Sequence, residues 1–375
     1  STGYELLKEF PITDKAFYRN AGDLCRSKNA MQYHFYGSST SGSTGESFYF
    51  DLDINRHAWA MAAKYRTDTF SGIYPHESRA SLWGANFDNK ASKSIKDRFR
   101  KYLTPFTFLS SYNLSETQIA KHIVALKKNQ PKLLVSYPTP LVELAEYCKN
   151  KNIELPFLKS IICSSEQLFD FQRALIEEVF NVPVYNRYGT REFGSIAQQC
   201  AEREGLHINS ERVFIEVLDD NDMPCAPGVK GQLVITDLDN KVMPLIRYRV
   251  GDFAAWSEDV SCDCKRGLPL LKFIEGRAFD VVRTPNGTVI SGTFWTLLTR
   301  YVSKQIKVFQ VVQNSLDTIN INIVTLNGGD LQNAEKDSLI KKIKEKDELL
   351  KVTISLVEHI ELTKSGKRRF IISNI

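Results

Sequence analysis

The sequence predicts an α/β protein. We expect a large N-terminal α/β domain with a parallel sheet and a β-rich subdomain, and a small, mobile α+β C-terminal domain. Up to about residue 200, segments of helical period alternate with short apolar runs, and from about Val213 the apolar residues recur with a period of 2. We place the domains at residues 1–278 and 279–375, with the β-rich part at about 208–278.

The first part contains helices and strands in the order that a parallel sheet needs. Ser115 is suited to cap a helix whose apolar face holds Ile119, Ile123 and Leu126, and Pro131 ends this helix. A strand at 133–136, a helix at 141–149, a strand at 161–163, a helix at 170–180 and a strand from Val184 follow. This alternation predicts that a ligand binds at the carboxyl ends of the strands.

The later elements have a different pattern. Strands are expected at 213–218, 232–236 and 245–248, separated by turns such as Pro227–Gly228. The last part should contain a helix at about 293–302, strands at 308–312 and 319–324, a helix at 331–346 and a strand at 352–357. These elements are sufficient for a small α+β domain.

Composition excludes several classes of protein. The chain has 375 residues and a net charge of +5, with Lys and Arg interleaved among Asp and Glu, so we expect no nucleic-acid partner. No apolar run is long enough to span a membrane, the first ten residues lack the layout of a signal peptide, and the seven cysteines are an odd number for a disulfide framework. We therefore expect a cytoplasmic protein. The chain starts at Ser1 rather than Met, so the sequence leaves open whether a further segment precedes it. It also leaves open whether the protein is a homodimer.

A run of small polar residues lies between two aromatic segments: Thr40, Ser41, Gly42, Ser43, Thr44 and Gly45. Such a run is either a flexible linker or a loop whose backbone N–H groups converge on phosphate. A Walker loop would need Lys after Gly42, where this chain has Ser43, and the chain has no G-x-G-x-x-G. Both common nucleotide-binding motifs are therefore excluded.

Four further segments follow this loop: Tyr188-Gly189-Thr190-Arg191-Glu192, then Tyr248-Arg249-Val250-Gly251-Asp252, Glu275-Gly276-Arg277 and Ser365-Gly366-Lys367. In this order they resemble the adenylate-forming superfamily of acyl-CoA synthetases and adenylation domains. The most similar branch is that of phenylacetate-CoA ligase and its relatives in capsular polysaccharide biosynthesis. The resemblance extends over nearly the whole chain.

The resemblance implies an ATP- and Mg²⁺-dependent enzyme that joins a small carboxylic acid to AMP, releases pyrophosphate and passes the acyl group to CoA or another thiol. Glu192 would bind Mg²⁺, Tyr188 would stack on adenine, Asp252 would accept from the ribose hydroxyls, and Lys367 would be the main catalytic residue. Arg191 would contact a phosphate. The residues expected to bind the nucleotide are Thr40 to Gly45, Ser165, Glu166, Arg187, Tyr188, Gly189, Thr190, Asp252 and Arg277.

Three positions depart from the pattern of that superfamily. Glu46 stands where a Lys is usual, Arg191 replaces a hydroxyl residue, and Phe279 occupies the usual acidic hinge position. Transfer to CoA is therefore less secure than adenylation. One alternative is transfer to an amine or hydroxyl, for example an amino sugar in surface-polysaccharide assembly. Another is an inactive nucleotide-binding relative, against which the joint presence of Glu192, Asp252 and Lys367 argues.

A separate set of residues has the chemistry of a metal site: Cys200, His207, Cys262 and Cys264. Three thiolates and an imidazole match the donors and the coordination number of structural zinc. The alternative is a set of unrelated reduced cysteines around a buried histidine.

Overall fold

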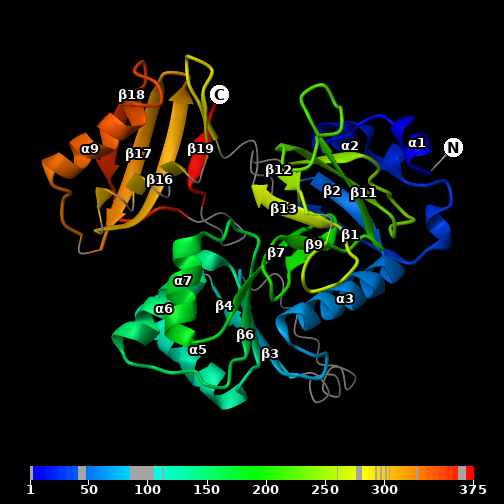
Figure 1. The fold of residues 1–375 in the computed structure, drawn as a ribbon, viewed down its shortest axis with the longest axis horizontal. Helices are drawn as coiled ribbons and strands as arrows, with labels where there is room; N and C mark the ends of the chain where they lie inside the picture. Colours follow the sequence, from blue (N-terminus) through cyan, green and yellow to red (C-terminus); the bar gives the residue numbers. More distant parts are fainter. Residues whose placement is uncertain are drawn as a thin grey trace. The chain divides into compact units, whose positions relative to one another are not determined.

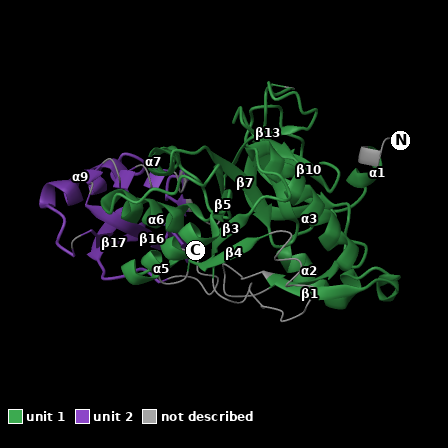
Figure 2. Cartoon of the chain, turned by 90° about the horizontal axis from the view of Figure 1, so that it is seen from below, with its two compact units in different colours: residues 1–276 green, residues 277–375 purple. Residues whose placement is uncertain are grey.

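The computed structural model describes residues 3–40, 48–84, 105–111, 114–259, 261–275, 281–291, 294–295, 298–299, 302–303, 305–326, 328–361 and 369–375. The chain forms two compact units, Ser1–Gly276 and Arg277–Ile375 (Figure 2). Among the described residues, no helix is both long and apolar enough to cross a membrane.

A single mixed sheet of eleven strands forms the centre of the first unit, in the order β10-β11-β12-β13-β9-β8-β7-β6-β5-β3-β4 (Figure 1). Its parallel part consists of β3 (Arg79–Trp83), β4 (Phe106–Ser110), β5 (Leu133–Ser136), β6 (Ser160–Ser164) and β7 (Val184–Thr190). Its antiparallel part consists of β8 (Gly194–Gln199), β9 (Leu206–Ile208), β10 (Val213–Leu218), β11 (Gly231–Asp237), β12 (Tyr248–Trp256) and β13 (Leu270–Glu275). The β-rich region therefore continues the parallel sheet, with β7 and β8 as the junction.

Three amphipathic helices pack against the parallel part (Figure 1). They are α5 (Glu116–Asn129), α6 (Pro138–Asn150) and α7 (Asp170–Phe180). Ser115 caps α5, because its hydroxyl accepts a hydrogen bond from the amide of Gln118 at 3.3 Å. Leu126, Leu144 and Ile176 are fully or almost fully buried in the core that these helices share with the strands.

The N-terminal segments pack on the antiparallel part. Here lie α1 (Gly3–Lys8), α2 (Lys15–Ala21), the 3₁₀ turns Gly22–Cys25 and Ala30–Gln32, and the hairpin of β1 (Phe35–Thr40) and β2 (Phe48–Asp53). Helix α3 (Ile54–Asp68) follows directly, capped by Asp53, and continues into the 3₁₀ turn Thr69–Ser71. Tyr18, Phe48, Phe193 and Tyr248 form an aromatic core between the hairpin and the sheet.

The prediction of a strand at 245–248 is wrong. Residues 244–247 are irregular, and β12 begins only at Tyr248. Arg247 has a φ of 45°, which a continuous strand cannot accommodate. This conformation turns its guanidinium onto Glu216, with two hydrogen bonds of 3.0 Å. The strands expected at 133–136 and 213–218 and the helix at 170–180 are confirmed.

The second unit is an α+β structure. It contains the hairpin of β14 (Val281–Arg283) and β15 (Val289–Ser291) and the sheet β18-β17-β16-β19, with α9 (Asn333–Lys344) sharing its core. The sheet strands are β16 (Ile306–Ser315), β17 (Thr318–Thr325), β18 (Lys351–Leu356) and β19 (Ile371–Ser373). Of the helix expected at 293–302, residues 294–295, 298–299 and 302 are described and are helical.

Candidate functional site

Strand β7 ends in a tight turn that carries Arg191 and Glu192. Gly189 has to be glycine here, because a Cβ at that position would overlap the main-chain carbonyl of Gly194 across the turn. The hydroxyl of Thr190 accepts a hydrogen bond from the amide of Phe193 at 3.2 Å, which closes the turn. The carboxyl end of β7 is thus a compact, well-defined structure.

Glu192 points inward from this turn, and only 5% of the residue is exposed. Its Oε1 lies 3.5 Å from the hydroxyl of Tyr248, a fully buried residue at the start of β12. Its main-chain carbonyl accepts a hydrogen bond from the guanidinium of Arg56 on α3. A nearly buried carboxylate at the end of a strand is suited to bind a hard cation such as Mg²⁺.

Tyr188 and Asp252 are in direct contact. The hydroxyl of Tyr188 donates a 2.5 Å hydrogen bond to Oδ2 of Asp252, a residue that is 9% exposed on β12. Gly251, with a φ of 86°, precedes Asp252 in that strand. Two side chains near the end of β7 therefore meet two side chains of β12, although β8, β9 and β13 separate these strands in the sheet.

Arg187 occupies a different environment from the one expected. Its guanidinium is buried, donates to Gln198 at 2.7 Å and forms an ion pair with the fully buried Asp68 at the end of α3. Burial would raise the pKa of Asp68, but Arg187, Lys64 and Arg79 outweigh it and hold that pKa below its usual value. The charge of Arg187 is therefore engaged inside the protein, which favours support of β7 over direct contact with a phosphate.

Ser165 and Glu166 follow the carboxyl end of β6, where Ser165 has a φ of 68°. An oxygen of Glu166 accepts a hydrogen bond from the amide of Thr139 at 3.2 Å, which ties this turn to the start of α6. Near the carboxyl ends of β3 and β5, the rings of Trp83 and Tyr137 lie 4.2 Å apart. These turns lie on the edge of the sheet where the ligand crevice of a parallel sheet is expected.

Several of the expected residues lie outside the described part of the chain. They are Ser41, Gly42, Ser43, Thr44 and Gly45 of the small-residue loop, with Glu46 after it, and Arg277, Phe279 and Lys367. Thr40 is described as the last residue of β1. Their roles stay predictions.

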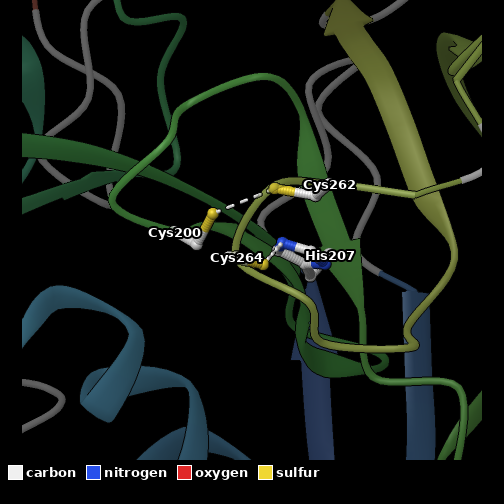
Figure 3. Close-up of side chains that lie close together, drawn as sticks. All are labelled: Cys200, His207, Cys262 and Cys264. Carbon is white, nitrogen blue, oxygen red and sulfur yellow. Dashed lines mark hydrogen bonds between the residues drawn. The ribbon is translucent and has the colours of Figure 1, made fainter.

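The structure brings the four expected metal ligands together (Figure 3). Cys200 follows β8, His207 lies on β9, and Cys262 and Cys264 come from the segment before β13. Their ligand atoms all lie within 4.8 Å of one another. The Sγ atoms of Cys200 and Cys262 are 3.6 Å apart, and Sγ of Cys264 is 3.2 Å from Nε2 of His207.

These distances fit a tetrahedral metal better than a disulfide. Two sulfur ligands on one zinc ion lie about 3.8 Å apart, whereas a disulfide bond is about 2.05 Å long. Burial and the nearby Arg266 lower the pKa of His207, which favours the neutral imidazole that a metal ligand requires. All four positions of a tetrahedron are then filled by protein, which is typical of a structural site.

Sequence reasoning missed the buried charged residues that hold β7 and the turn after it, namely Asp68 for the strand and Arg56 and Arg212 for the turn. They carry no local motif, and each acts on a segment more than 15 residues away in the chain. Arg56 lies in the first turn of α3 and Asp68 is its last residue, and nothing in the helical pattern marks either one as buried.

Comparison with known proteins identifies relatives for most of the chain. The profile of the CapK C-terminal domain family matches residues 282–374. "Protein CapK" of Staphylococcus aureus is 29% identical over 347 residues, which cover 90% of this chain and 74% of that protein. The phenylacetate-coenzyme A ligase of Thermus thermophilus is 27% identical over 168 residues, which cover 43% of this chain and 38% of that enzyme.

Solved structures confirm the predicted fold class. A 2-hydroxyisobutyryl-CoA ligase in complex with R3-HIB-AMP superposes with a TM-score of 0.72 at 17% identity, over 97% of this chain and 80% of that one. The anthranilate CoA ligase AuaEII in complex with anthranoyl-AMP gives a TM-score of 0.65 at 13% identity, over 89% of this chain and 65% of that one.

Proposed function

This chain is a relative of CapK and of the phenylacetate-CoA ligases within the adenylate-forming superfamily, and on that premise we propose that it is an ATP-dependent, AMP-forming acid ligase. In the first step a carboxylate oxygen attacks the α-phosphorus of ATP. The bond from that phosphorus to the oxygen it shares with the β-phosphate breaks, and pyrophosphate leaves. In the second step a thiol sulfur attacks the acyl carbon, AMP leaves, and the thiol proton is released.

The observation that carries this proposal is the meeting of β7 and β12. Tyr188 with Asp252, and Glu192 with Tyr248, form two side-chain contacts between the end of β7 and β12. Asp252 would accept from the ribose hydroxyls, since an ionised carboxylate offers two acceptor oxygens. Tyr188 would cover the adenine with its ring. Glu192 would bind Mg²⁺, which neutralises charge on the leaving pyrophosphate.

The small-residue loop and Lys367 are given roles from the order of the sequence motifs, because most of the loop and Lys367 lie outside the described residues. The loop from Thr40 to Gly45 would hold the β- and γ-phosphates. Lys367 would place its ammonium between the acid and the α-phosphate as negative charge builds there. One preorganised cation of this kind contributes about 3–4 kcal/mol to the transition state.

The acyl acceptor has two candidates. CoA or another thiol is the first, because relatives with this fold are CoA ligases. An amine or hydroxyl, such as that of an amino sugar in surface-polysaccharide assembly, is the second. What favours the second is that CapK matches 90% of this chain, whereas the phenylacetate-CoA ligase of T. thermophilus matches only 43% of it.

We further propose that Cys200, His207, Cys262 and Cys264 bind a structural zinc ion. The donor set and the distances in the cluster support it. All seven cysteines are free of disulfides in the structure, which suits the reducing cytoplasm that we propose as the compartment.

An exchange assay tests the ligase activity. Labelled pyrophosphate is incubated with ATP, Mg²⁺ and a panel of aryl and short aliphatic acids, and we expect label to enter ATP only when an accepted acid is present. CoA is then added to the active mixtures, and loss of the acyl-adenylate as thioester identifies a thiol acceptor. A folded protein that binds ATP but supports no exchange with any acid would contradict the proposal.

A further inference from the structure

Two buried arginines hold the turn that carries Glu192. The guanidinium of Arg56 donates to the main-chain carbonyl of Glu192, and Nη1 of Arg212 donates to the carbonyl of Phe193 at 3.1 Å. Arg56 is 3% exposed and Arg212 is 1% exposed. Two successive carbonyls of one turn are therefore bound by two different side chains, one from α3 and one from the segment before β10.

Both arginines are themselves anchored on the segment that ends β11. Nε of Arg56 donates to Oδ2 of Asp237 at 2.9 Å, and Nε of Arg212 donates to Oδ2 of Asp239 at 2.6 Å. Oδ1 of Asp237 accepts from the amide of Asp239 at 2.9 Å and from the amide of Asn240 at 3.3 Å. Asn240 in turn donates to the carbonyl of Asp51 at 2.9 Å. The anchor is thus connected to β2 as well as to β11.

This arrangement fixes more than the position of the turn. A carbonyl that accepts from an anchored, planar guanidinium is restrained from rotating, so the peptide planes on both sides of Phe193 are restrained. Restraint of the first plane limits the directions that the Cα–Cβ bond of Glu192 can take. At the other end of the side chain, the hydroxyl of Tyr248 lies 3.5 Å from the carboxylate. Glu192 is therefore constrained at its backbone and at its tip.

Simple stabilisation of the fold is a weaker explanation. A buried ion pair offsets its desolvation only when further donors of the guanidinium also find partners, and here one further nitrogen of each arginine donates to the same functional turn. Arg247 shows the alternative: it makes a bidentate pair with Glu216 at 3.0 Å and donates to the carbonyl of Phe10, with no link to Glu192.

We infer that Arg56 and Arg212 are positioning residues that hold the Glu192 carboxylate ready for Mg²⁺. The inference rests on the proposed function in its reference to Mg²⁺, whereas the restraint of the turn can be measured without any activity. Neither arginine is expected to touch substrate. Their loss should weaken use of the metal ion while leaving recognition of the acid unchanged.

The test uses Arg56→Gln and Arg212→Gln, with Arg56→Lys and Arg212→Lys as second variants. Arg66→Gln is the matched control, since Arg66 lies on α3 but its guanidinium pairs with Glu211 at 2.9 Å and contacts Asn209 instead of the turn. The first readout is amide hydrogen exchange of residues 188–194 in the full chain. We expect about tenfold faster exchange in the glutamine variants, since each loses a charge-assisted hydrogen bond, and no change there in Arg66→Gln.

The second readout is the Mg²⁺ concentration that gives half-maximal pyrophosphate exchange at saturating ATP and acid. We expect it to rise about tenfold in the glutamine variants, with the KM for the acid unchanged. The lysine variants should restore little of the wild-type Mg²⁺ requirement, because a lysine ammonium lacks the planar set of N–H donors with which a guanidinium binds a carboxylate and a carbonyl together. If a glutamine variant does not fold, the lysine variant at that position is measured in both assays and the same changes are expected.

Unchanged exchange at residues 188–194, or exchange raised equally throughout the protein, overturns the inference. So does an unchanged Mg²⁺ requirement in an active variant. If the wild-type protein supports no pyrophosphate exchange with any acid, the proposed function fails, but hydrogen exchange still decides whether the two arginines restrain the turn.

Discussion

Tyr188 donates a 2.5 Å hydrogen bond to Asp252, across a sheet in which three strands lie between the two residues. The contact joins the last parallel strand to the antiparallel part. It also orients the carboxylate that we propose binds ribose, before any nucleotide is present. The strength of this contact can therefore be measured through the affinity for ATP.

Replacing Tyr188 with Phe should raise the KM for ATP about three- to tenfold and change kcat little. The ring that would cover adenine is kept and only the hydrogen bond to Asp252 is lost, so ATP binding should lose a part of the about 1.5–3 kcal/mol that a hydrogen bond to a charged acceptor contributes. Initial rates of acid-dependent pyrophosphate release over a range of ATP concentrations measure the change.

Tyr185→Phe is the control for that variant. Tyr185 lies three residues earlier on β7 and so on the opposite face of the strand. The Tyr185→Phe variant also removes one tyrosine hydroxyl, but not the one that contacts Asp252. The effects of Tyr188→Phe and Asp252→Asn on the KM for ATP should be less than additive in the double variant, since both substitutions weaken the same contact. Equal KM values for Tyr188→Phe and Tyr185→Phe would refute the role of the hydrogen bond.

Lys367→Ala should abolish acid-dependent pyrophosphate release while the protein stays folded. The ammonium would act on charge that develops only in the transition state, so kcat should fall by about 10²- to 10³-fold with little change in ATP binding. Lys364→Ala, in the same basic segment, serves as the control. A Lys367→Ala protein that keeps more than about a tenth of the wild-type rate would remove Lys367 from the mechanism.

The elements that could be predicted from the sequence are those with a local signal. Helix 170–180 and strands 133–136 and 213–218 each have a clear apolar period and a turn signal at their ends. The continuity of the sheet could not be predicted. It depends on β9 and β13, which pair through Leu206 and His207 with Leu271 and Leu270, residues more than 60 positions apart.

The same distinction applies to the site. Glu192, Asp252 and the cysteines can be proposed from the sequence because their residue types and order are uncommon. Arg56 and Arg212 cannot be, because a buried arginine is recognised only when the carboxylate and the carbonyl that it binds are known. At Arg247 a local pattern was misleading, since a left-handed residue breaks the apolar run before β12.

Lys64 provides a prediction on pH and stability. Burial, and then the charge of Arg187, lower its pKa from 10.5 to about 8, despite an ion pair with Asp68 at 3.3 Å. The native state therefore binds this proton less tightly than the unfolded state does. Between about pH 8 and 10.5, the unfolded chain holds more protons at this site, so its contribution to stability rises with pH over that window.

Lys64→Met should consequently be more stable than the wild type at pH 7, by about 1–2 kcal/mol after allowance for the partial exposure of the side chain. The difference should shrink as pH rises above 8 and vanish near 10.5, where the unfolded lysine also loses its proton. Urea unfolding of both proteins at several pH values measures it. A wild type that is the more stable of the two at pH 7 would show that the pair with Asp68 outweighs burial.

Removal of zinc should destabilise the first unit without directly disabling the nucleotide site. Cys200 follows β8, and the turn with Glu192 precedes this strand, so about 20 Å of extended chain separates the cluster from the turn.

Protein purified without added metal should contain about one zinc per chain by atomic absorption. Cys262→Ser should lose that zinc and several degrees in Tm, because three remaining ligands bind the ion much more weakly. Its kcat below the new Tm should stay within about threefold of wild type, a change of under 1 kcal/mol.

Cys225→Ser, whose thiol lies outside the cluster, should keep both the zinc and the Tm. Zinc-free wild-type protein with the stability of the Cys225→Ser control would leave the four residues as ordinary reduced side chains, and the folding of the hairpin of β8 and β9 would then need no metal.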